Sequence, residues 1–157
     1  MKNCCFLILI FAFSNANAQP QTEQVPQNVS KHFLIILSTK NYESAKILAK
    51  ESAKKLNLKL DLRGLRQNSE SGLTFTTKEC EGNGWDYPCY VSRGRYDDGE
   101  YVTIDYSDAF EGFAKGYYVV TTASGDAAFV KKALAKVRNV YKTAYLKKTD
   151  VYIGCMH

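Results

Sequence analysis

Residues 117–147 have the pattern of a strand, a helix and a returning strand, and this pattern limits the folds available to the chain. Residues 117–122 are all aromatic or β-branched, which favours a strand. Ser124 is a plausible N-cap for the helix that follows. The apolar residues after it recur at helical spacing, at Ala127, Val130, Ala133, Leu134 and Val137. Residues 144–147 then indicate the second strand, so we predict one βαβ unit.

An earlier stretch, residues 32–62, repeats the same order. It begins with an uninterrupted apolar run, and Asn41 is a good N-cap for a helix that extends to Leu56. Residues 58–62 then alternate between apolar and polar side chains, as a half-buried strand does. Two βαβ halves predict an α+β domain, a βαββαβ sandwich in which an antiparallel sheet carries both helices on one face.

Residues 68–116 separate the two halves and are too long for a simple turn, so we interpret them as an insert. Within it, residues 89–96 and 100–106 flank Asp-Asp-Gly, a strong signal for a β-hairpin. The acids at this turn could instead bind calcium, but the twelve-residue pattern of a calcium loop is absent from the sequence. We therefore predict an inserted β-hairpin segment.

The N-terminus carries the three regions of a secretory signal peptide in order. Lys2 gives a positive start, residues 4–13 are apolar, and Ala16-Asn17-Ala18 fits a cleavage site. The apolar run is too short to span a bilayer, and no later segment is apolar enough to do so. We predict a signal peptide over residues 1–18, a mature protein from about Gln19, and a periplasmic or secreted location; a buried hydrophobic N-terminus is the alternative.

The polar residues 19–30 are expected to form a flexible leader, and residues 31–157 a single domain. The mature chain keeps Cys80, Cys89 and Cys155, and an exported protein can hold a disulfide. The nearest pair, Cys80 and Cys89, is the favoured bridge, although sequence alone does not fix the connectivity. A metal site at Cys155 and His157 lacks further ligands at recognisable spacing, so we expect neither a metal nor another cofactor.

Charge is distributed unevenly along the mature chain, which has 20 basic and 16 acidic residues. Residues 70–116 hold 10 of the acids and only 4 basic groups, whereas both flanking parts are basic. Because an exported chain rarely meets nucleic acid, we expect no nucleic-acid partner; the basic ends are either solvated helix faces or contacts for anionic envelope polymers.

The sequence offers few groups for catalysis. His32 and His157, at opposite ends of the mature chain, are its only histidines, which makes a histidine-activated nucleophile improbable. Acidic residues are plentiful, but most lie in or beside predicted turns, where Asp is ordinary. We therefore expect no catalytic residues and a protein that is not an enzyme.

Two stretches carry a resemblance to a known family. Residues 106–120, with the following helix and residues 144–147, resemble the second half of SPOR (sporulation-related repeat) domains, and residues 33–58 resemble the first half. The strands of that family usually end in Gly-Ser-Phe or Gly-Pro-Phe; here residues 38–40 read Ser-Thr-Lys and residues 121–123 read Thr-Thr-Ala. The insert with its cysteines is additional to the basic domain.

The resemblance implies an exported module that binds peptidoglycan, preferring glycan strands stripped of peptides, through the sheet face away from the helices. Aromatic rings can stack on sugars, and arginines can pair with carboxylates or acetyl carbonyls. The candidate ligand-binding residues are Trp85, Tyr87, Arg93, Arg95, Tyr101, Tyr117 and Tyr118. The alternative is a protein-interaction module that inhibits or escorts an envelope protein through the acidic, aromatic insert.

Overall fold

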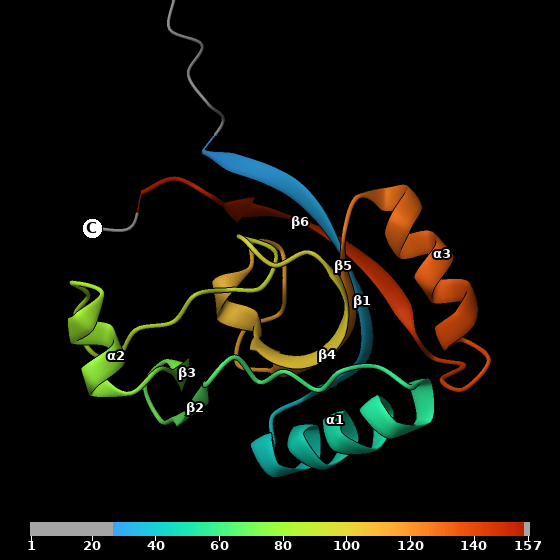
Figure 1. Cartoon of the computed structure of the whole chain (residues 1–157), viewed down its shortest axis with the longest axis horizontal. Helices are drawn as coiled ribbons and strands as arrows, with labels where there is room; N and C mark the ends of the chain where they lie inside the picture. Colours follow the sequence, from blue (N-terminus) through green and yellow to red (C-terminus); the bar gives the residue numbers. More distant parts are fainter. Residues whose placement is uncertain (1–26, 156–157) are drawn as a thin grey trace, which may run out of the picture.

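The computed structural model describes residues 27–155, so the predicted signal peptide lies outside the described residues (Figure 1). The elements in chain order are β1 (Asn28–Thr39), α1 (Tyr42–Leu56), β2 (Arg66–Asn68), β3 (Gly72–Thr74), α2 (Thr77–Gly82), β4 (Gly99–Tyr106), the short 3₁₀ helix η1 (Ser107–Ala109), β5 (Tyr118–Gly125), α3 (Ala127–Val137) and β6 (Tyr145–Tyr152).

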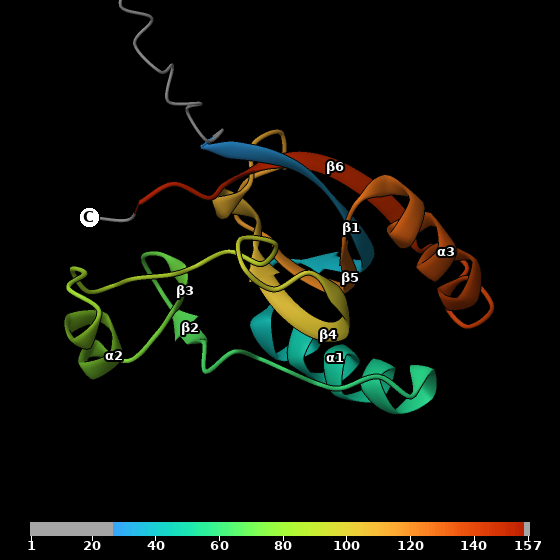
Figure 2. The same cartoon turned by 45° about the horizontal axis from the view of Figure 1, so that its top comes forward.

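The main sheet has the strand order β4-β5-β1-β6, and every neighbouring pair is antiparallel. Both α1 and α3 pack on the same face of this sheet and share one hydrophobic core with it. Figures 1 and 2 show the two helices on the outer side of the curved sheet, with α2, β2 and β3 forming a separate lobe. The predicted α+β class, with a four-stranded antiparallel sheet, is confirmed.

Local signals explain where the two long helices begin. The side chain of Asn41 accepts a hydrogen bond from the backbone N–H of Ser44, so α1 has the predicted N-cap. The N-cap of α3 is Asp126, whose side chain accepts from the N–H of Phe129. The predicted cap, Ser124, belongs instead to the end of β5 and is fully buried, because β5 continues to Gly125.

The second strand of the βαββαβ order is β4, not residues 58–62 as the sequence suggested. Residues 58–62 make only an isolated parallel bridge, between Leu60 and Val102. β4 pairs along much of its length with β5 and buries Val102 and Ile104 against the helices. The alternation in residues 58–62 is real, because their leucines contact the core, but this segment lies at the sheet edge and forms few bonds.

The predicted hairpin around Asp97-Asp98-Gly99 is wrong, because residues 89–98 form no strand. This segment crosses the sheet, and a Cβ at Gly94 would lie 3.0 Å from the ring of Phe33. The hairpin of this region is β2–β3 instead, and the inserted segment lies between α1 and β4. Residues 28–30, expected in the flexible leader, belong to β1 and pair with β6 as far as Asn28 with Tyr152.

The predicted disulfide between Cys80 and Cys89 is present, and Cys155 is a free, exposed thiol. The bridge joins α2 to the segment that returns toward the sheet, and both of its cysteines are buried. Within residues 27–155, no helix has the length and apolar character needed to cross a membrane.

The double variant Cys80→Ser/Cys89→Ser is expected to lower the free energy of unfolding by roughly 2–3 kcal/mol, because an open chain gains loop entropy when it unfolds. Urea unfolding followed by circular dichroism measures this difference. A Cys155→Ser variant serves as the control, since that thiol makes no bridge. An unchanged midpoint in the double variant would contradict the expectation.

Candidate functional site

The sheet face away from the helices is largely covered by the chain itself. On its apolar half, Phe33, Ile35 and Val151 pack against Phe110 and Phe113. The last two come from the connector between β4 and β5, and the rings of Phe33 and Phe110 lie 4.9 Å apart. A ligand therefore cannot lie flat along this part of the sheet.

The other half of the same face is polar, and Arg93 covers it. The Arg93 side chain is 0% exposed. Its guanidinium donates to Ser124 Oγ at 3.0 Å and to Thr121 Oγ1 at 2.8 Å. It also donates to the backbone carbonyls of Tyr101 and Gly99. Because its nitrogens bond to the protein, Arg93 stabilises the crossing segment and is not available to a ligand.

Asp105 is the anion at the centre of this polar half and is also 0% exposed. Its Oδ1 accepts from Arg63 Nη2 at 2.6 Å, from the Tyr90 hydroxyl at 2.7 Å and from the backbone N–H of Arg93 at 3.1 Å. Burial alone would lower the pKa of Arg63, but the charge of Asp105 holds that pKa above its ordinary value. Asp105 is therefore the nearer of the two carboxylates that pair with Arg63; the other is Asp97, at 3.9 Å.

Tyr90 and Tyr101 line this network, and burial raises the pKa of both phenols. A raised folded-state pKa gives stability that is fully present below the unfolded value, near pH 10, and is lost as pH rises above it. We expect alkaline unfolding in which these phenols ionise together with loss of the fold. The phenolate absorbance that Tyr101 contributes is the difference between the unmodified chain and Tyr101→Phe, and this difference should change in parallel with circular dichroism. Tyr101→Phe should also make the decline of stability with pH shallower. Complete phenol ionisation in a chain that stays folded would contradict this expectation.

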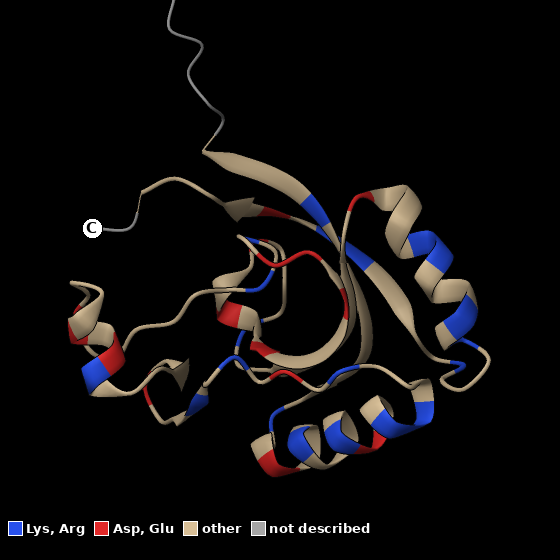
Figure 3. Ribbon diagram, in the orientation of Figure 1, with Lys and Arg blue, Asp and Glu red and all other residues tan. Residues whose placement is uncertain are grey.

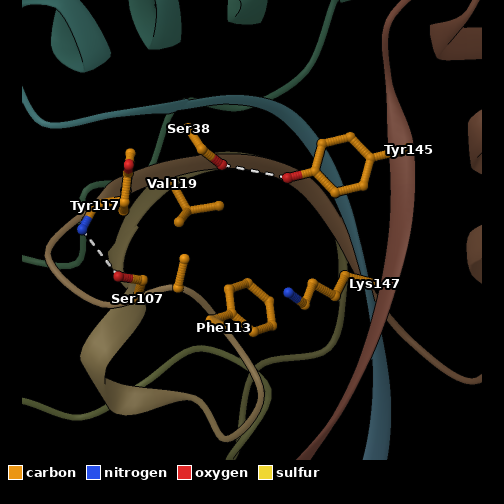
Figure 4. A pocket seen from close by; sticks show the side chains of 8 residues that line it. Ser38, Ser107, Phe113, Tyr117, Val119, Tyr145 and Lys147 are labelled. Carbon is orange, nitrogen blue, oxygen red and sulfur yellow. Dashed lines mark hydrogen bonds between the residues drawn. The ribbon is translucent and has the colours of Figure 1, made fainter.

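A hollow on this face lies where β1 ends and β5 and β6 begin (Figure 4). We call it the cleft; its volume is about 130 Å³. It is lined by Ser38, Ser107, Phe113, Ala114, Tyr117, Val119, Tyr145 and Lys147. Figure 4 shows side chains from the strands and from the connector around one common space.

A β-bulge in β1 places Ser38 in the cleft. The register between β1 and β5 shifts twice between Leu34 and Leu37, so Ile36 and Leu37 both contact the core on the helix side. Ser38 then returns to the opposite face, directly across from Val119. On β6, which pairs with the other edge of β1, Tyr145 lies opposite Ile35 and therefore shares its face.

Hydrogen bonds and one cation–π contact fix the walls of the cleft. The hydroxyl groups of Ser38 and Tyr145 lie 3.3 Å apart. Ser107 Oγ accepts from the backbone N–H of Tyr117 at 2.9 Å. The Lys147 ammonium lies 4.4 Å from the centre of the Phe113 ring.

The chemistry of the cleft suits a polar ring with acceptor groups. Tyr145 is 41% exposed and Tyr117 half-buried, so both present aromatic surface together with a phenol oxygen. Lys147 supplies a cation, and Lys40, which does not line the cleft, lies 5.4 Å from the centre of the Tyr117 ring. Within residues 27–155, no group of three or more metal-ligating side chains could hold a metal ion.

The seven residues that the sequence suggested do not form one site. Tyr117 lies in the cleft, whereas Tyr118 is 6% exposed, packs on the helix side, and donates its hydroxyl to Gly72 O. Tyr101 donates to Asp97 beneath the Arg93 guanidinium.

The remaining suggested residues lie away from the cleft. Arg95 is buried and donates to the carbonyls of Tyr152 and Gly154, which holds the end of β6. Trp85 and Tyr87 belong to the disulfide-bonded lobe, where Tyr87 is 48% exposed.

Comparison with family models, with curated proteins and with solved structures finds no match.

Four residues of the cleft were not predicted from the sequence: Ser38, Phe113, Tyr145 and Lys147. Tyr145 and Lys147 carried a usable signal, because residues two apart on a strand share a face. Ser38 carried none, because its face depends on the bulge, and Phe113 reaches the cleft only through the course of the connector.

Proposed function

We propose that this chain is an exported, non-catalytic module of the cell envelope that recognises peptidoglycan glycan strands at the cleft. The observation that carries the proposal is the combination of Tyr117, Tyr145 and Lys147 around one open hollow. Aromatic faces stack on sugar rings, and hydroxyl and ammonium groups bond the oxygens of sugar substituents. This proposal replaces the broad sheet face implied by the SPOR resemblance, because the chain covers that face itself.

The size of the cleft favours recognition of one unit of a polymer. Its volume of about 130 Å³ is smaller than the pockets that enclose most small ligands. Such a hollow holds one ring or its substituent, and we expect weak binding to a single unit. A glycan strand repeats that unit many times, which raises the apparent affinity through repeated encounters along the polymer.

The residues around the cleft support binding better than catalysis. Its hydroxyl groups belong to Ser38, Ser107 and the two tyrosines, and among residues 27–155 neither a histidine nor a carboxylate lines it. A serine nucleophile needs an adjacent base, and glycoside hydrolysis needs a pair of carboxyl groups at the scissile bond. We therefore propose that the ligand leaves the cleft chemically unchanged.

Titration with soluble, peptide-free glycan fragments tests the proposal and locates the site. We expect chemical-shift changes at the backbone amides of Ser38, Tyr117 and Tyr145. The only tryptophan, Trp85, lies in the disulfide-bonded lobe, so its fluorescence should stay constant. Shift changes confined to that lobe, together with a fluorescence change, would contradict glycan binding at the cleft.

A second candidate function is a protein-interaction module that uses the disulfide-bonded lobe. The observation that favours it is the exposure of Tyr87 beside the half-buried Trp85, on a braced loop that projects from the sheet (Figure 2). Exposed aromatic side chains are typical anchors of protein interfaces. The same titration separates the two candidates, because a glycan should not affect this lobe.

A further inference from the structure

Residues 58–62 add a short, incomplete strand to the β4 edge of the sheet. The N–H of Val102 donates to Lys59 O at 2.8 Å, and the N–H of Asp61 donates to Val102 O at 2.9 Å. Figures 1 and 2 show this segment leaving α1 and running along the outer side of β4. The pairing is parallel and includes a single bridge, between Leu60 and Val102.

The backbone N–H and C=O of Leu60 point away from β4. In an extended segment, alternate residues direct their N–H and C=O groups to opposite sides, so Lys59 and Asp61 bond β4 while Leu60 points outward. Within residues 27–155, neither the N–H nor the C=O of Leu60 has a backbone partner. An edge with free backbone groups is a template for another strand.

A groove lies beside this open edge. It is lined by Lys50, Ala53, Lys54, Leu58 and Leu60, and its volume is about 470 Å³. Its apolar wall comes from alanine and leucine, while two exposed lysines of α1 stand at its side. Figure 3 shows the line of basic residues along α1. Lys59 adds no free charge here, because it pairs with Asp61 at 2.7 Å.

We propose that this edge binds an extended, acidic segment of a partner protein by strand addition. The main chain of the partner bonds the N–H and C=O of Leu60, one apolar side chain enters the groove, and flanking carboxylates pair with Lys50 and Lys54. The lysines select an acidic sequence by charge complementarity. A lipid could supply the anion and the apolar chain, but it has no peptide groups to match the outward backbone of Leu60.

A capped, acidic peptide of about eight residues, with alternating Val and Thr between terminal Glu residues, is the probe. We expect it to slow hydrogen exchange at the Leu60 amide by at least about tenfold at saturation. Lys50→Glu/Lys54→Glu should weaken binding about tenfold, whereas Lys131→Glu/Lys132→Glu, the matched change on α3, should not. Leu60→Pro removes the outward N–H, keeps the groups that bond β4, and should weaken binding similarly.

Four results would overturn the proposal. The first is equal binding of a peptide in which Lys replaces Glu, and the second is an unchanged exchange rate of the Leu60 amide at saturating peptide. The third is protection of that amide by anionic vesicles but not by the peptide. The fourth is protection of that amide in the free chain because two copies associate through this edge. Tyr145→Ala should leave peptide binding intact, because the cleft lies on the opposite face of the sheet. Failure here is thus distinguishable from failure of the glycan proposal.

Discussion

Replacing Asp105 with Asn is expected to lower the free energy of unfolding by about 3–5 kcal/mol, the largest single-residue effect that we expect in this chain. The carboxylate is fully buried and accepts from Arg63, Tyr90 and the backbone of Arg93. Asn keeps the shape but removes the charge, so the buried Arg63 loses its 2.6 Å ion pair and keeps only the longer pair with Asp97, at 3.9 Å. The NH₂ group of Asn is itself a donor, so it cannot accept the hydrogen bonds of Arg63 and Tyr90.

Equilibrium urea unfolding measures this loss, and Asp150→Asn is the matched control. Asp150 lies exposed on β6, and its replacement should change the free energy of unfolding by less than about 0.5 kcal/mol. If Asp105→Asn and Asp150→Asn unfold at the same urea concentration, the buried network does not hold the crossing segment on the sheet.

The double variant Tyr117→Ala/Tyr145→Ala is expected to weaken binding to peptide-free glycan by at least about tenfold. It removes both tyrosine rings of the cleft together with the phenol oxygen that lies 3.3 Å from Ser38 Oγ. Because Tyr145 is exposed and Tyr117 only half-buried, the fold should persist. Unfolding measurements check that persistence, and titration with glycan fragments measures the affinity.

The matched control for this pair is Tyr87→Ala/Tyr96→Ala. It removes the same number of rings from exposed positions outside the cleft, and Tyr96 is 77% exposed. We expect this control to bind glycan as the unmodified chain does. The opposite pattern, with binding lost in the control and kept in the cleft variant, would place the ligand on the lobe or on the crossing segment.

Periodicity predicted the parts of the fold that local physics determines. The cap at Asn41 and the apolar stripes of both long helices follow from side chains that lie near one another in sequence. Nearby side chains do not determine which segment becomes the second strand, because apolar and polar residues alternate both in residues 58–62 and in β4. β4 takes the place beside β5 through long-range pairing that no short window of sequence contains.

The candidate site was less predictable than the fold, for a related reason. Arg93 resembles a ligand-binding residue in the sequence, because a buried arginine and an exposed one have the same local pattern. Only the crossing of residues 89–98 over the sheet brings Arg93 to Thr121 and Ser124. Tyr117 was predicted, but Ser38, Tyr145 and Lys147 reach the same cleft from strands far away in the chain.

Co-sedimentation of the chain without its predicted signal peptide with purified sacculi, before and after an amidase removes the stem peptides, tests the central proposal most directly. We predict that more protein pellets after peptide removal, and that Tyr117→Ala/Tyr145→Ala abolishes the increase. Absence of pelleting under both conditions, with the folded protein at the same concentration, would contradict recognition of the glycan strand by this cleft.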